Sequence, residues 1–380
     1  MNSLRLLGLG LFCSLALGAA PVKIILDTDM IGDYDDVGAM AVLHTLADEG
    51  ACEILATVSS THSNASVGTI EIVNRYYGRP EIPVGAVKND GVGGGSENPQ
   101  RRSHVKYEKL LQMYPGWWRY RNANESPDAT DVYRRVLAAQ PDCSTTVVTT
   151  GFLTNLRKLL QSTPDAFSPL DGKALVKAKV KALYVMGGKV PKGREFNLFN
   201  DPVSADFVFR QWPTRLIVND FWFGTYIYAG RKVTALPTGN PVRDIYAMCL
   251  PSAEKCPPAA EIIPTGRFKD NVKEGHNCFD QSCVLAAVRG PGSFFRLERG
   301  RMEMVGEKGG NVWKPDPDGP HELMGFVPDW PRERIASEID ELMARPPKRP
   351  STALLRAGAG RREKDRRLQA EGRSGGFKRN

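Results

Sequence analysis

The sequence predicts an α/β protein built on a mainly parallel, doubly wound sheet with helices on both faces. Three observations lead to this fold class. Short runs of branched apolar residues alternate with helical patterns between residues 22 and 220. The apolar runs are continuous, as is typical of strands that are buried on both faces. Polar residues gather where a strand gives way to a helix, which is where such sheets bind ligands.

Each expected element has its own pattern. Strands are expected where branched apolar residues dominate, at residues 22–29, 52–60, 80–87, 144–151, 180–188 and 214–220. Helices are expected where apolar residues recur every three to four positions, at residues 36–50, 66–78, 152–162 and 201–212. Gly50 closes the first of these helices. Residues 89–130 show no clear period and are predicted to form a long loop region.

Both ends of the chain differ in composition from the part between them. Residues 1–20 contain one arginine, a short apolar run and then small residues, which predicts a signal peptide and a secreted or periplasmic protein. A membrane anchor is the alternative. The run is shorter than the ~20 residues of a spanning helix, so no span is expected in the mature chain. Residues 345–380 are predicted to be a basic, disordered tail, which leaves residues 21–344 as one domain.

The net charge of +8 comes from this tail. The tail holds twelve Lys or Arg residues and three acidic ones, so the rest of the chain is close to neutral. The folded domain is therefore not expected to bind nucleic acid.

Six cysteines follow the signal peptide, and disulfides are open to them in an exported protein. Cys249 with Cys256, and Cys278 with Cys283, are the pairs closest in sequence, although the sequence does not fix the connectivity. The chain contains no C-x-x-C pair, which argues against a zinc ribbon.

The stretch KIILDTDMIGDYDDVGAM, residues 23–40, places five aspartates within ten positions directly after a strand. So many carboxylates repel one another unless a cation or hydrogen-bond donors compensate. Helix capping by Asp35 and Asp36 accounts for two acids at most. Oxygen donors with no His or Cys nearby select a hard divalent ion, Ca²⁺ or Mg²⁺. An EF-hand loop does not fit, because Ile31 and Gly38 occupy positions that need oxygen ligands.

Four motifs follow one another in a characteristic order. They are DTDMIGDYDD at residues 27–36, VVTTGFLTNL at 147–156, YVMGGKVPKGREFNLFNDPVSADFVF at 184–209 and FDQSCVLAAVRG at 279–290. Through them the chain resembles the nucleoside hydrolases over about residues 23–290. The resemblance implies the fold of that family, a bound Ca²⁺, and hydrolysis of the N-glycosidic bond of ribonucleosides to a free base and ribose.

The resemblance also implies roles for single residues. The Ca²⁺ ligands would be three carboxylates and one carbonyl oxygen, those of Asp29, Asp36, Asp280 and Thr150. Asp35 would act as base towards a calcium-bound water. The polar groups that hold the ribose hydroxyls would be Asn64, Glu195 and Asn197, with Asp27 and Asp33 as supporting acids.

Two departures from the family pattern leave the nucleobase preference open. The acidic loop is two residues longer than the commonest form and adds Asp33. Phe279 stands where many members carry a histidine, and His276 lies three positions earlier. Stacking on an aromatic ring is another way to bind a base, and the candidates for it are Trp117, Trp118, Trp222 and Phe279.

Other functions stay open beside this interpretation. A non-catalytic nucleoside-binding protein would keep the metal and ribose site, and an N-glycosidase for another ribosyl compound would keep the chemistry. A phosphatase fits less well, because Ile31 breaks the Asp-x-Asp-x-Thr pattern. In the leading interpretation the partner is a small-molecule nucleoside, and a homo-oligomer is compatible with the sequence.

Overall fold

The computed structural model of the chain describes residues 20–88, 91–92, 104–249, 275–292, 294–327 and 332–349. The predicted signal peptide lies outside these residues apart from Ala20, and so does the tail from residue 350 onwards. Both stay predictions, and the N-terminal residue of the mature protein would test export. Within the described ranges, no helix is both long and apolar enough to cross a membrane.

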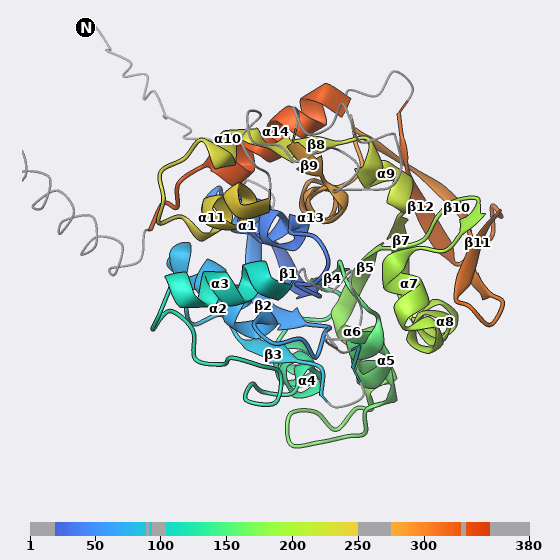
Figure 1. Cartoon of the computed structure of the whole chain (residues 1–380). Coiled ribbons are helices and arrows are strands. Elements are labelled where there is room, and N and C mark those ends of the chain that lie inside the picture. Colours follow the sequence, from blue (N-terminus) through green and yellow to red (C-terminus); the bar gives the residue numbers. More distant parts are fainter. Residues whose placement is uncertain are drawn as a thin grey trace, which may run out of the picture.

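A ten-stranded sheet runs through the described part of the chain (Figure 1). Its strands lie in the order β3 (Val84–Ala86), β2 (Cys52–Ser59), β1 (Val22–Thr28), β4 (Thr145–Thr149), β5 (Val180–Met186), β7 (Arg215–Asn219), β12 (His321–Phe326), β10 (Phe295–Val305), β11 (Gly310–Pro315) and β6 (Lys192–Gly193). The strands from β3 to β12 in this order are parallel to one another, and the last three pair antiparallel. The prediction of a mainly parallel sheet is confirmed.

Helices cover both faces of the sheet (Figure 1). One face is covered by α1 (Asp35–Asp48), α2 (Ser66–Tyr76), α3 (His104–Met113), α11 (Pro241–Cys249), α13 (Phe279–Arg289) and α14 (Arg332–Ala344). The other is covered by α4 (Ala129–Ala138), α5 (Thr154–Gln161), α6 (Gly172–Lys179) and α8 (Pro202–Gln211). Successive residues of β1 show the two cores, because Ile24 and Leu26 belong to the first and Ile25 to the second. The doubly wound arrangement is therefore confirmed.

Shorter elements complete the described chain. Three of them are the helices α7 (Phe196–Asn200), α9 (Phe221–Thr225) and α10 (Arg231–Thr234). The strands β8 (Tyr228–Gly230) and β9 (Gly275–Asn277) pair antiparallel in a separate two-stranded ribbon. This ribbon places His276 opposite Ala229.

The strands and helices expected between residues 22 and 220 are all present, but the loop predicted for residues 89–130 is wrong in part. Helix α3 lies within it. The buried apolar residues of that helix are Tyr107, Leu110 and Leu111, and Tyr114 follows one position after its end. These positions form one helical face, half of which is tyrosine, so a pattern that counts aliphatic residues misses it.

One of the expected disulfides is wrong. Cys278 and Cys283 are both buried free thiols, at the N-cap and in the second turn of α13. Side chains five positions apart at the start of a helix point to different sides, which keeps the two sulfur atoms from pairing. The other expected pair includes Cys256, which lies outside the described residues.

Candidate active site

The parallel strands converge on a cavity of about 380 Å³ at their carboxyl ends. Asp29 lines it directly after β1, Thr150 directly after β4, and Met186 at the end of β5. This edge is where an open parallel sheet exposes backbone and side-chain groups to a ligand. Asp35 and Asp36 reach the same cavity from the first turn of α1.

The acidic loop between β1 and α1 is held by its own side chains. The Asp36 carboxylate accepts hydrogen bonds from the hydroxyl of Thr28 and from the backbone N–H of Met30. Met30 is buried and has a φ of +50°, a left-handed conformation that few non-glycine residues adopt. The Asp29 carboxylate accepts from the N–H of Ile31 at 3.2 Å. The loop thus turns its carboxylates inward.

Helix α3 fixes the same loop from outside. Lys106 Nζ donates to the carbonyl oxygen of Gly32 at 2.8 Å, and Tyr107 Oη donates to that of Asp33 at 2.7 Å. Neither residue was a candidate from the sequence, because α3 falls in the segment predicted to be a loop.

Four carboxylates of the cavity are almost completely buried. Asp29, Asp35, Asp36 and Asp280 are each at most 4% exposed. One oxygen from each of Asp35, Asp36 and Asp280 lies within 4.8 Å of the others. Within the described residues, none of the four pairs with a lysine or arginine. Asp35 and Asp36 both lie in the first turn of α1, where the helix dipole favours negative charge, but neither accepts an N–H of that helix among the described contacts.

The electrostatics of this group favour a bound cation. Burial, and then the neighbouring carboxylates, raise the pKa values of Asp29, Asp35 and Asp280 well above the ordinary range of aspartate. The same causes raise the pKa of Asp36 to about 6. Buried acids without a counter-charge are costly to ionise. A divalent ion on these oxygens would supply the missing charge, and the donor set fits one.

Asp27 supports the site from behind the cavity. Its carboxylate is fully buried and accepts hydrogen bonds from Tyr133 Oη at 2.9 Å and Asn155 Nδ2 at 3.1 Å. Its carbonyl oxygen accepts from the N–H of Thr150 at 2.8 Å. Burial raises the pKa of Asp27 to about 7, even though both side-chain donors act to lower it.

Glu195 and Asn197 line the cavity at the start of α7. The Glu195 carboxylate accepts from the backbone N–H groups of Gly188, Asn197 and Leu198, at 2.9 to 3.2 Å. Asn197 Nδ2 donates to the carbonyl oxygens of Thr150 and Met186, both at 3.2 Å. The carbonyl oxygen of Thr150 is therefore held in place by one of the predicted ribose ligands.

Asn64 does not join these residues. It lies in the loop between β2 and α2, is exposed, and is not part of the cavity wall. Of the residues predicted to hold the ribose, the structure brings only Glu195 and Asn197 to the cavity.

Aromatic residues line the same cavity as the carboxylates. They are Phe152, Phe196, Phe221 and Phe279. The rings of Phe221 and Phe279 stack with centroids 5.1 Å apart and planes 24° apart. Among the aromatic candidates from the sequence, Phe279 lines the cavity, whereas Trp117, Trp118 and Trp222 do not. The sequence could have indicated Phe221 as a cavity residue, since it directly follows the polar end of a predicted strand.

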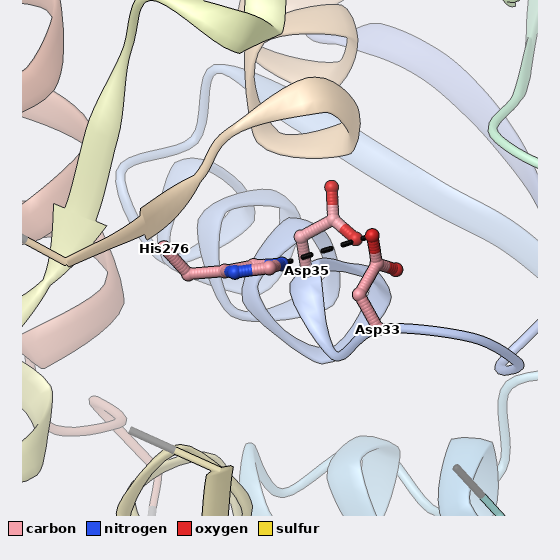
Figure 2. A group of neighbouring side chains, drawn as sticks. All are labelled: Asp33, Asp35 and His276. Carbon is pink, nitrogen blue, oxygen red and sulfur yellow. Dashed lines mark ion pairs between the residues drawn. The ribbon is translucent and has the colours of Figure 1, made fainter. Parts of the chain in front are cut away.

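Asp33 forms an ion pair with His276 beside Asp35 (Figure 2). Its side chain lines the cavity and is 43% exposed, and Oδ2 lies 3.7 Å from Nε2 of His276. Burial acts to raise the pKa of Asp33, but His276 and hydrogen bonding with Asp35 outweigh it and lower the pKa to about 2.

Comparison with known families identifies the chain. A model of the family described as inosine-uridine preferring nucleoside hydrolase matches residues 24–320. The chain belongs to this family. This nucleoside hydrolase is accordingly an enzyme that hydrolyses N-glycosyl bonds of nucleosides, and the predicted resemblance is confirmed. No curated protein matches the sequence.

Solved structures share the fold of this nucleoside hydrolase at low sequence identity. The plant nucleoside hydrolase PpNRh1 is 20% identical, with a TM-score of 0.58 over 86% of this chain and 100% of its own. The purine-preferring ribonucleoside hydrolase from Gardnerella vaginalis is 18% identical, with a TM-score of 0.61 over 85% and 99%. The type III effector protein XopQ, solved with adenosine diphosphate ribose, is 17% identical, with a TM-score of 0.63 over 86% and 94%.

Proposed function

We propose that this nucleoside hydrolase acts on ribonucleosides and depends on calcium. The observation that carries the proposal is the buried group of Asp35, Asp36 and Asp280, gathered at the cavity of a chain of this family. We assign the ion to Asp29, Asp36, Asp280 and the carbonyl oxygen of Thr150. This all-oxygen donor set favours Ca²⁺ over softer ions. When bound, Ca²⁺ would neutralise the carboxylates and orient the ribose hydroxyls and the attacking water.

The ribose would bind to Glu195 and Asn197. Asn197 uses its amide nitrogen on two backbone carbonyl oxygens, which orients the side chain and leaves its Oδ1 for a ribose hydroxyl. Backbone N–H groups fix the Glu195 carboxylate in the same way. Both side chains are therefore arranged before the substrate arrives, so little ordering is needed on binding.

Cleavage of the N-glycosidic bond builds positive charge on the ribose, which nearby carboxylates stabilise. Asp35 accepts the proton of the attacking water as general base. The nucleobase rests against the stacked rings of Phe221 and Phe279, whose faces suit any base.

Asp29 is the second candidate for the base. It lines the same cavity, and its oxygens are not among the three carboxylate oxygens that lie within 4.8 Å of one another, whereas one oxygen of Asp35 is, so this distance on its own favours Asp35 as the ligand and Asp29 as the base. In the alternative assignment, Asp35 binds the ion and Asp29 accepts the proton. The Ca²⁺ affinities of the two asparagine variants separate these assignments.

Product analysis on a panel of nucleosides tests the function. The full chain is incubated with Ca²⁺ and each common ribonucleoside, and the products are separated by chromatography. We expect free base and ribose in equal amounts from at least one ribonucleoside, and slower release from the matching 2′-deoxynucleoside, which lacks a hydroxyl contact. Absence of base release from every ribonucleoside would overturn the proposal. Release from a different ribosyl compound alone would overturn the substrate class.

A further inference from the structure

His276 brings a nitrogen donor to the edge of the acidic group. One ligand atom from each of Asp33, Asp35 and His276 lies within 4.8 Å of the others. The three side chains come from the acidic loop, the first turn of α1 and strand β9 (Figure 2). Figure 2 shows the imidazole ring reaching from β9 towards the two carboxylates. This set differs from Asp35, Asp36 and Asp280 in its imidazole and in its exposed member, Asp33.

The imidazole is held without using the atom that faces the carboxylates. Its ring stacks on Tyr34 with centroids 4.1 Å apart and planes 22° apart, and Tyr34 packs edge-on against Tyr246 at 4.7 Å. Nε2 is buried and has no hydrogen-bond partner among the described residues. A buried ring nitrogen normally has a partner, so this one has an unused donor or acceptor site that points at Asp33.

The separation of the donors suits a shared cation better than a hydrogen bond. Nε2 of His276 and Oδ2 of Asp33 are 3.7 Å apart, beyond hydrogen-bond distance. Two ligands bound at about 2.0–2.2 Å to one tetrahedral Zn²⁺ lie about 3.4 Å apart. A small movement of the Asp33 side chain, which is 43% exposed, would close the difference.

We propose that Asp33, Asp35 and His276 form a second cation site, which takes a first-row divalent ion such as Zn²⁺ and lies beside the proposed calcium ligands, since Asp35 also belongs to the buried group with Asp36 and Asp280. One imidazole and two carboxylates suit such an ion, whereas Ca²⁺ prefers oxygen ligands alone. Asp33 and Asp35 line the cavity, so the ion can enter from there. The hydrogen bonds from Lys106 and Tyr107 of α3 fix the backbone of the loop that carries Asp33.

Occupation of this second site regulates the enzyme. This consequence rests on the proposed function, because it requires Asp35 to be the general base. An ion on Asp35 keeps that carboxylate from accepting a proton, so Zn²⁺ slows base release without displacing Ca²⁺.

Binding of Co²⁺ to the full chain tests the site without relying on activity. Co²⁺ replaces Zn²⁺ in nitrogen and oxygen sites and absorbs visible light there. The titration is run in saturating Ca²⁺, which occupies the oxygen site. His276→Asn removes the imidazole donor, and Asp33→Asn replaces a charged carboxylate with a weaker, neutral amide ligand. His62→Asn is the matched control, since His62 bonds to Asn124 and does not line the cavity.

We expect visible absorption with the unaltered protein and with His62→Asn, and at least ~10-fold weaker Co²⁺ binding in both ligand variants. Melting curves show whether each ligand variant folds. If one of them does not, the other still tests the site. Equal Co²⁺ affinity in all four proteins would overturn the site and leave His276 and Asp33 as an ion pair. Zn²⁺ that binds there without slowing base release would overturn the regulatory consequence alone.

Discussion

Asp35→Asn is expected to keep Ca²⁺ bound and to lower turnover by at least ~10²-fold, the usual scale for loss of a general base. Asparagine has the same shape and can still accept the N–H of Asp280, which now lies 3.2 Å from Asp35 Oδ2. It cannot take a proton from water. Fold and metal site should therefore survive while the chemistry slows.

Asp36→Asn provides the contrast, because it should weaken Ca²⁺ binding as well as turnover. Asp36 accepts from Thr28 and Met30 and belongs to the buried carboxylate group, so losing its charge affects the ion directly. Calorimetric Ca²⁺ titration and turnover are measured side by side for both variants and for Asp29→Asn. Full activity in Asp35→Asn would show that another residue is the base. Loss of Ca²⁺ in Asp35→Asn with retention in Asp29→Asn would show that the two roles are exchanged.

Gly151→Ala is expected to destabilise the protein by about 1–3 kcal/mol and to lower Ca²⁺ affinity and turnover together. A Cβ at this position would lie 2.7 Å from the Cβ of Asp29 and 2.8 Å from its backbone nitrogen. Real Cβ atoms do not approach backbone so closely, so the β1 and β4 ends must move apart. That movement displaces Asp29 and the adjoining Thr150, two of the proposed ligands.

Gly292→Ala is the matched control for this substitution. A Cβ there meets nothing within 4 Å, and its φ is outside the left-handed region. Thermal unfolding with and without Ca²⁺ compares the two variants. A Gly151→Ala protein that gains as much stability from Ca²⁺ as the unaltered protein would show that the close approach does not position the ion.

Periodicity was sufficient to predict the parallel strands up to β7, because they are buried on both faces and carry continuous apolar runs, but it did not predict the parallel strand β12. Ile24, Ile25 and Leu26 are such a run, and each is fully buried. The antiparallel strands β10 and β11 were not predicted. Their burial alternates with exposure, and charged residues interrupt the apolar ones, so their pattern is weak.

The candidate site could be predicted where it follows the strands in sequence order. Asp29 and Thr150 come directly after β1 and β4, so parallel pairing alone brings them to one edge. Contacts that depend on packing of distant segments could not be predicted. Lys106 lies 74 positions from the carbonyl of Gly32 that it binds, and His276 reaches Asp33 only through the β8–β9 ribbon.

Base release by chelator-treated protein, measured with and without added Ca²⁺, tests the calcium-dependent chemistry most directly. We expect no release from the metal-free protein and recovery of activity as about one Ca²⁺ binds per chain. At the same Ca²⁺ concentration, Asp36→Asn should not recover. Undiminished release by the metal-free protein, or recovery with Zn²⁺ and not with Ca²⁺, would contradict the assignment of this carboxylate group as a calcium centre.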